Sequence, residues 1–224
     1  MRFDEFEKNL VGTFPGVTQA QIKQFALMEE GYADWNSKIN VISRKDIDGL
    51  YDHHVLHSLA IAEYLRTMKA EEYSEMTRTG NGTRVLDLGT GGGFPGIPLA
   101  ILFPEVRFTL CDSIRKKTIV AEGIAGLLGL KNVEIVNARA ESLGMKFDYV
   151  VSRAVASLTD FYPWVKGCYS KSILYLKGGD INEEICELMR RERMQKGTIA
   201  TWPVDRWLED DYFAGKFVID IASR

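Results

Sequence analysis

Residues 85–96 read VLDLGTGGGFPG, a short apolar segment followed by a glycine-dense loop, and this segment most constrains the fold. Glycine alone takes left-handed backbone dihedrals without cost and lets the chain pass close to a ligand. A strand that leads through such a loop into a helix is typical of sheets that hold a nucleotide-like cofactor at their carboxyl edge. The segment therefore predicts an α/β fold with a cofactor site at the loop.

The pattern of the loop discriminates between classes of cofactor. A P-loop needs G-x-x-x-x-G-K-[ST], and no lysine follows these glycines. A dinucleotide fingerprint fails from Gly89 because Phe94 takes the sixth position, although the spacing from Gly91 fits it. Asp87 discriminates between a dinucleotide and S-adenosylmethionine, because a carboxylate would repel a nearby pyrophosphate but would attract a cationic sulfonium. We interpret D-x-G-x-G-x-G as an S-adenosylmethionine loop rather than a glycine-rich turn with a capping aspartate.

A second acid follows the next expected strand. Asp112 lies about 20 positions past Gly89, the usual distance for a carboxylate that receives ribose hydroxyls. Asp112 with Ser113 is also typical of a helix N-cap. Both roles can hold together because the strand ends where a helix is expected to begin.

Composition limits the class of protein. The chain has 224 residues, of which 46% are hydrophobic and 26% charged, as expected of one globular domain with an appended subdomain. The net charge of −3 gives no global sign of nucleic-acid binding, so basic residues that hold RNA would have to gather on one face. The chain shows no signal peptide, no membrane span and no C-x-x-C pair. We expect a cytoplasmic protein with reduced thiols.

Hydrophobic patterning changes once along the chain. Apolar residues recur at helical spacing up to about residue 70, and the polar segment 70–83 is expected to be the join. From residue 84 strands alternate with helices, which predicts a mostly parallel, doubly wound sheet. The last two strands have no helix between them, so this end of the sheet is expected to be antiparallel. Strands are expected near 84–88, 106–111, 132–137, 148–152, 171–176, 197–201 and 216–222.

Seven segments occur in the order typical of one bacterial family. They are DWNSKINVISRKD (34–46), HHVLHSL (53–59), DLGTGGGFPGIPLAI (87–101), LCDSIRKK (110–117), NARAE (137–141), VVSRAVASL (150–158) and YLKGG (175–179). With them the chain resembles the small-subunit ribosomal RNA guanine-N7 methyltransferases, RsmG, also called glucose-inhibited division protein B. The resemblance implies a helical region over residues 1–75 and a class I, Rossmann-like methyltransferase domain over 76–224. It also implies S-adenosylmethionine as methyl donor and 16S rRNA as substrate.

The resemblance implies cofactor contacts at Gly89, Phe94, Ala140, Glu141 and Arg153. The Phe94 ring can form a wall beside the cofactor, and Ala140 is small enough to let adenine pass. The Glu141 carboxylate can meet the adenine edge, although an acid early in a helix also complements the helix dipole. Arg153 can hold the methionine carboxylate or an RNA phosphate. Its alternative is an ion pair that braces the loop.

The chemistry needs no general base, because guanine N7 bears a lone pair and no proton. We therefore expect no catalytic acid or base; the protein positions and desolvates the reactants. The absence of N/D-P-P-Y and of a Pro-Cys pair disfavours methylation of exocyclic amines and of pyrimidine C5. The candidates for RNA contact are Arg139 and Lys177, which flank the expected cofactor edge, and Arg44 and Lys45.

One departure from the family pattern concerns the histidines. His57 stands where many relatives carry aspartate, and any role of that aspartate is in doubt here. His53, His54 and His57 lack further ligands for a metal, so we expect them to form hydrogen bonds and expect no metal site. A monomer is expected. Two alternative functions stay open, an NAD(P)-dependent oxidoreductase and a non-catalytic ribosome-binding module.

Overall fold

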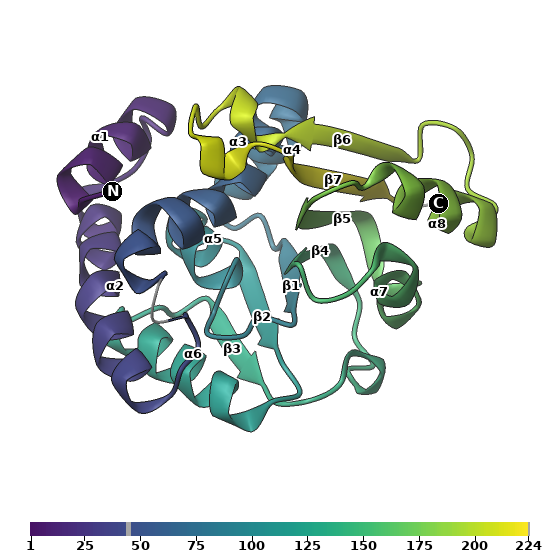
Figure 1. The fold of residues 1–224 in the computed structure, drawn as a ribbon. Helices are drawn as coiled ribbons and strands as arrows, with labels where there is room; N and C mark the ends of the chain where they lie inside the picture. Colours follow the sequence, from purple (N-terminus) through teal and green to yellow (C-terminus); the bar gives the residue numbers. More distant parts are fainter. Residues whose placement is uncertain (44–45, 224) are drawn as a thin grey trace.

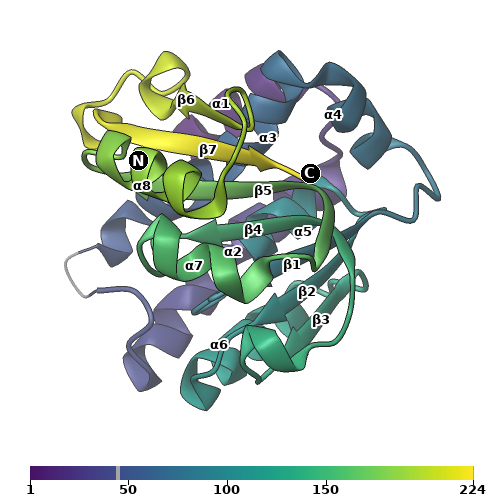
Figure 2. The same cartoon turned by 90° about the vertical axis from the view of Figure 1, so that its right-hand side faces the viewer.

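A seven-stranded sheet forms the centre of the computed structural model, which describes residues 1–43 and 46–223. The strand order is β3-β2-β1-β4-β5-β7-β6, with β6 and β7 at one edge and β3 at the other (Figure 2). The strands are β1 (Arg84–Leu88), β2 (Arg107–Cys111), β3 (Val133–Val136), β4 (Phe147–Arg153), β5 (Tyr169–Gly178), β6 (Ile199–Pro203) and β7 (Lys216–Ala222). β1 to β5 are parallel, and β7 is antiparallel to both of its neighbours. The predicted doubly wound sheet with an antiparallel end is confirmed.

Helices cover both faces of the sheet. Figure 1 shows α1 and α2 on one side of the sheet and α7 and α8 on the other. The α-helices are α1 (Phe3–Thr13), α2 (Gln19–Lys38), α3 (His57–Met68), α4 (Ala70–Thr77), α5 (Gly96–Leu102), α6 (Arg115–Leu127), α7 (Leu158–Val165) and α8 (Asn182–Glu192). A π-helix, η2 (Leu50–Leu56), leads into α3, and a 3-10 turn, η3 (Ala140–Ser142), follows β3. No helix in the described ranges is long and apolar enough to cross a membrane.

The alternation of side chains along the strands divides the interior into two layers. In β1, Val85 packs in the core beneath the N-terminal helices, whereas Leu86 and Leu88 pack in the core beneath α7 and α8. In β4, Tyr149 and Val151 face the first core. Successive side chains of a strand point to opposite faces. Asp87 in β1 and Arg153 at the end of β4 are therefore on the side of the N-terminal helices.

The prediction that residues 70–83 form an irregular join is wrong for the first half of the segment, because Ala70–Thr77 form the helix α4. Met76 is buried and Tyr73 packs edge-on against Phe103, with ring centroids 5.7 Å apart. These two apolar residues, one helical turn apart, stabilise α4, and the charged residues around them hid this spacing in the sequence. The N-terminal helices and the sheet share one hydrophobic cluster, which includes Phe6 of α1 and Val218 of β7.

Candidate functional site

A cavity of about 600 Å³ opens at the carboxyl ends of β1, β2, β3 and β4. This is the edge at which a parallel doubly wound sheet binds its ligands. The sequence-predicted residues Gly89, Asp112, Arg139, Ala140, Glu141 and Arg153 line it, together with Leu88, Ser113, Ile114, Lys117, Ala138, Ala154, Val155 and Trp164. Asp87, Gly91 and Phe94 do not belong to this lining.

The glycine loop requires its left-handed residues. Gly89 and Gly91 have φ of 72° and 59°. A Cβ added at Gly89 would lie 2.4 Å from Cγ2 of Val155, whereas one at Gly91 would meet no atom within 4 Å. The amides of Gly89 and Thr90 both donate to the Cys111 carbonyl, at 2.8 and 3.1 Å. Glycine at position 89 therefore lets β1 turn towards β2 while Val155 packs over it.

Asp112 holds the loop and faces the cavity. Its Oδ2 accepts from the Gly91 amide at 3.0 Å, and its Oδ1 accepts from the Ile114 amide at 2.8 Å. The expected N-cap role is wrong, because α6 begins at Arg115 and has Ile114 at its N-cap position without a side-chain cap. The carboxylate instead forms a tight turn with the amide two residues on. A carboxylate has about four lone-pair sites, so ligand hydroxyls can still donate to it.

The end of β3 forms the next part of the wall. Ala140 and Glu141 open the short turn η3, and both line the cavity beside exposed Arg139. The side chain of Asn137 donates to the Asp112 carbonyl at 2.8 Å. This bond ties the β3 loop to the end of β2. The small side chain of Ala140 leaves space beside the carboxylate of Asp112.

The observed position of Asp87 differs from the one that the loop pattern suggested. Its carboxylate is fully buried on the side of the N-terminal helices, and its Oδ2 accepts from Thr90 Oγ1 at 2.5 Å and from the Gly96 amide at 2.8 Å. Burial raises the pKa of Asp87 to about 7. The carboxylate does not line the cavity, so the geometry gives no support to a contact between its charge and a cationic ligand. Asp87 braces the loop from behind.

Phe94 and Arg153 also turn towards the helices. The Phe94 ring stacks on Tyr32 at 4.8 Å between centroids, and Cζ of Arg153 lies 5.2 Å from the Phe94 centroid. The Arg153 guanidinium donates to the His53 carbonyl at 3.3 Å and to Nδ1 of His54 at 3.0 Å. Within residues 1–43 and 46–223, no carboxylate oxygen comes within ion-pair distance of it. The Phe94 ring thus lies against Tyr32 and outside the lining of this cavity. The contacts of Arg153 form a hydrogen-bond chain instead of the ion pair that was the alternative.

The histidines continue this chain. Asp46 lies within hydrogen-bond distance of Nδ1 of His53 and of Nε2 of His54, the latter at 2.8 Å. Because Nδ1 of His54 accepts from Arg153, its proton must be on Nε2 and the ring is neutral. Burial lowers the pKa of His54 to about 4, which agrees with the neutral ring. No cluster of three or more metal-ligating side chains occurs in the described part of the chain.

The structure separates the two preferred candidates for RNA contact, Lys177 and Arg139. Nζ of Lys177 donates to the Ala156 carbonyl at 3.1 Å and pairs with Glu184 at 2.9 Å, so this ammonium holds protein groups. Arg139, in contrast, is exposed at the cavity. Arg44 and Lys45 lie outside the described residues.

The sequence analysis missed three apolar residues at the mouth of the cavity. Ile114, Val155 and Trp164 are 48%, 39% and 36% exposed and all line it. Ile114 could have been found, because it lies two residues past Asp112, the acid that follows β2. Trp164 sits near the end of α7, away from the carboxyl end of β4, and no local pattern indicated its position.

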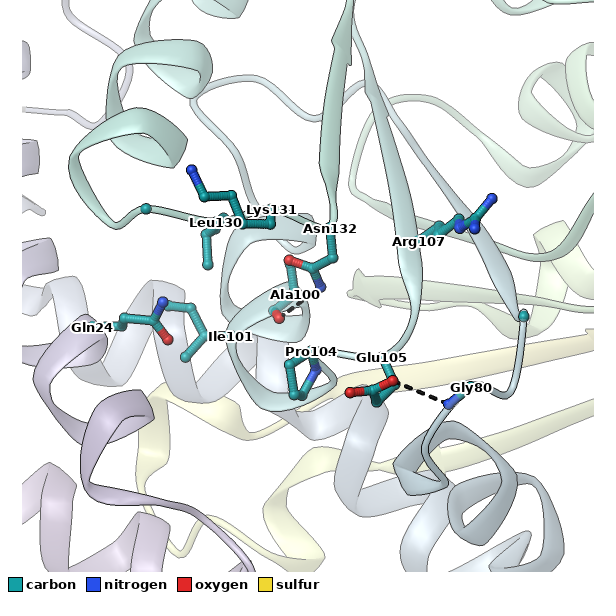
Figure 3. A pocket seen from close by; sticks show the side chains of 12 residues that line it. Gln24, Gly80, Ala100, Ile101, Pro104, Glu105, Arg107, Leu130, Lys131 and Asn132 are labelled. Carbon is teal, nitrogen blue, oxygen red and sulfur yellow. Dashed lines mark hydrogen bonds between the residues drawn. The ribbon is translucent and has the colours of Figure 1, made fainter.

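A second hollow, of about 510 Å³, lies at the amino edge of the sheet (Figure 3). The Asn132 side chain points into it and donates to the carbonyls of Ala100, Phe103 and Val106. The Gly80 amide donates to Glu105 at 3.0 Å, as the dashed line shows. These polar groups join the ends of strands and helices, which is a structural role.

Comparison with known proteins identifies the family. The family model described as rRNA small subunit methyltransferase G matches residues 20–204. The chain belongs to this family. It is 47% identical over 219 residues to the ribosomal RNA small subunit methyltransferase G of Flavobacterium psychrophilum, covering 94% of this chain and 95% of the relative. The namesake from Bacteroides thetaiotaomicron is 51% identical over 179 residues, 76% of this chain and 81% of the relative.

Solved structures agree on the fold. A magnesium protoporphyrin IX methyltransferase from Synechocystis PCC 6803 with bound S-adenosylmethionine superposes with a TM-score of 0.59 at 12% identity, covering 93% of this chain and 99% of that one. A ribosomal protein L11 methylase from Lactobacillus delbrueckii subsp. bulgaricus gives 0.53 at 18% identity, covering 75% and 76%. The class I fold predicted from the sequence is confirmed. The family assignment makes the chain an S-adenosylmethionine-dependent methyltransferase. It argues against the two alternatives, an NAD(P)-dependent oxidoreductase and a non-catalytic ribosome-binding module.

The residues at the cavity fit this cofactor. Asp112 presents a carboxylate for ribose hydroxyls, and Ala140 with Glu141 forms a wall beside it. Gly89 brings the backbone to the cavity where any Cβ would overlap Val155. The cavity is of the size that small-molecule sites usually have.

Proposed function

We propose that this member of the family transfers a methyl group from S-adenosylmethionine to N7 of a guanine in 16S rRNA. The observation that carries the proposal is the family match over residues 20–204, with a cavity at the glycine loop whose residues suit the cofactor. The protein acts on the small-subunit RNA, free or in the particle, as a cytoplasmic monomer.

In this proposal different cavity residues contact different parts of the cofactor. Asp112 accepts the ribose hydroxyls, as a charged acceptor that the Gly91 and Ile114 amides already orient. The turn at Ala140 and Glu141 contacts the adenine edge. Gly89 and the segment after β4 then flank the opposite end, because β1 and β4 follow β2 in the strand order.

When bound, S-adenosylmethionine would supply a methyl group on a sulfonium: the N7 lone pair forms the bond to the methyl carbon as the carbon–sulfur bond breaks, which leaves a neutral thioether and a positive charge on the guanine. N7 has no proton to lose, so no side chain acts as a base. The cavity residues contribute by placing the two reactants in line and by excluding water, and alignment of this kind is worth effective molarities of about 10⁵–10⁸ M. Arg153 supports the wall through His53 and His54 in this proposal, and does not contact the methionine carboxylate.

RNA contact depends on a local cationic rim. Arg139 is the principal candidate because it is exposed at the cavity. Lys177 is a weaker candidate, because its ammonium already binds Ala156 and Glu184. Arg44 and Lys45 remain candidates. An unpaired guanine that stacks at the rim suits a near-neutral protein better than recognition of an RNA duplex.

The test is the product. Purified protein, labelled S-adenosylmethionine and small-subunit particles that lack the modification should yield labelled RNA. The chain of that RNA should cleave at the modified base after borohydride reduction and aniline treatment, because N7-methylguanosine becomes labile. Methylated RNA that resists this cleavage, or label on protein, would refute the proposal. The single-turnover rate should also show no ascending limb between about pH 6.5 and 8.5, since no base must be deprotonated.

A further inference from the structure

A strained turn borders the cavity between β4 and α7. Ala154 has φ of 47°, which a residue with a side chain rarely adopts. Ala154 and Val155 both line the cavity, and Val155 packs over Gly89. Residues 154–157, called the β4 turn below, therefore need contacts from elsewhere to keep this conformation.

The Ala154 amide donates to the Leu176 carbonyl at 3.0 Å, and one hydroxyl holds the next two residues of the turn. The Tyr175 oxygen accepts from the amides of Val155 and Ala156, at 2.9 and 3.0 Å, and donates to the Ala156 carbonyl at 2.9 Å. A phenol offers one proton and lone pairs on one oxygen, and here all of its capacity serves the β4 turn. The ring itself is fully buried on β5 and meets Phe161 edge-on at 4.7 Å. The hydroxyl is thus held in place by the burial of its ring on β5.

A charged pair adds a second support. Lys177, two residues along β5, donates to the same Ala156 carbonyl. Its partner Glu184 accepts from the amide of Leu158, the first residue of α7, at 2.9 Å. The pair therefore joins the end of the β4 turn to α8.

The β4 turn lies at one end of the cavity. Ala140 and Asp112 follow β3 and β2, whereas Val155 follows β4, on the far side of β1 in the sheet. If ribose and adenine lie at β2 and β3, the turn borders the end at which methyl transfer takes place. A shift of the turn would then change the alignment of the reactants more than it changes cofactor binding.

We propose that Tyr175 is a positioning residue for methyl transfer, which acts through its hydroxyl on the β4 turn, and that Lys177 assists it. This inference rests on the proposed function. It assigns Lys177 to the protein scaffold and leaves RNA contact to other basic residues.

The decisive variant is Tyr175→Phe, which keeps the buried ring and removes the hydroxyl alone. We expect kcat to fall about tenfold and the Kd for S-adenosylmethionine to change less than about threefold, because misplacement by a fraction of an ångström affects alignment first. Tyr149→Phe is the matched control. Its hydroxyl is buried in the neighbouring strand β4 without a hydrogen-bond partner among the described residues, so kcat should stay unchanged. Equal kcat in wild type and Tyr175→Phe, or a loss confined to cofactor affinity, overturns the inference.

Lys177→Met separates the two roles of the lysine. A supporting role predicts a lower kcat with unchanged KM for RNA and unchanged salt dependence; a raised KM that responds to salt would make Lys177 an RNA contact and overturn its part.

Amide hydrogen exchange tests the role of Tyr175 without RNA. The peptide that spans residues 153–157 should lose protection in Tyr175→Phe and keep it in Tyr149→Phe. Unchanged protection refutes the inference even if the wild type proves inactive on RNA, whereas that inactivity alone refutes the proposed function.

Discussion

The glycine loop has two sides that differ in what their residues do. On the cavity side, Gly89 and Asp112 present backbone and a carboxylate to open space. On the helix side, Asp87 and Phe94 are buried against the loop and the N-terminal helices. Arg153 lines the cavity as well, but its guanidinium bonds to His53 and His54. The glycine motif itself thus contributes to both sides, with Gly89 at the cavity and Asp87 and Phe94 against the helices.

This difference separates binding from support within a single motif. The N-terminal region reaches the loop directly, since Tyr32 of α2 donates to the Gly92 carbonyl at 2.8 Å. Asp46 and His54 reach it through Arg153. The helical region therefore forms the rear wall of the cofactor loop. Substitutions on the cavity side should change cofactor affinity, whereas those on the helix side should change stability.

The largest effect is expected at Gly89. In Gly89→Ala the new methyl group would collide with Val155 and push the β4 turn, so we expect affinity for S-adenosylmethionine to fall more than about a hundredfold, or roughly 3 kcal/mol. Calorimetry checks this. The control is Gly129→Ala, which has a similar φ of 64° and open space around its Cβ. It should show the strain of the left-handed backbone, about 1–2 kcal/mol of stability, without loss of affinity. Equal affinities in the two variants would contradict the proposed contact.

Asp112→Ala should have the next largest effect. The variant removes a charged acceptor for ribose hydroxyls and frees the Gly91 amide, which together should cost about 1.5–3 kcal/mol, or ten- to hundredfold in cofactor affinity. Asp112→Asn keeps an acceptor for the loop and should lose less. If a folded Asp112→Ala protein bound the cofactor as wild type does, Asp112 would only stabilise the loop and would not contact the cofactor.

Arg139→Ala should weaken RNA use a few-fold and leave cofactor affinity unchanged, since the guanidinium is exposed at the rim. The slope of log KM against log salt should fall by about one for a lost phosphate contact. Lys131→Ala is the control, because Lys131 is exposed at the hollow on the amino edge of the sheet and should not contact the substrate. Equal salt slopes in both variants would place the RNA surface elsewhere.

Sequence predicted the cavity side better than the helix side. Gly89, Asp112 and Ala140 follow parallel strands, and topology brings such positions together at one edge. Asp87 and Arg153 face the N-terminal helices because side chains alternate between the two faces of the sheet along β1 and β4. The sequence contains this alternation, but the prediction followed the glycine motif instead. The partners of Arg153, about 100 positions earlier in the chain, were not predictable, because they depend on how the N-terminal helices pack.

Asp87→Asn should change cofactor affinity least, by less than about threefold, because the amide oxygen can still accept from Gly96 and the side chain does not face the cavity. Its effect is on stability and depends on pH. Burial raises the pKa of Asp87 to about 7, so between about pH 4 and 7 the folded state keeps a proton that the unfolded state has released. Wild-type stability from this group is therefore present below pH 4 and is lost as the pH rises through 7. Asparagine does not titrate, so urea denaturation should show the variant gaining stability relative to wild type from pH 5 to pH 8. A constant difference would mean that Asp87 ionises as freely as in the unfolded chain, and a tenfold loss of cofactor affinity would move it to the cavity side.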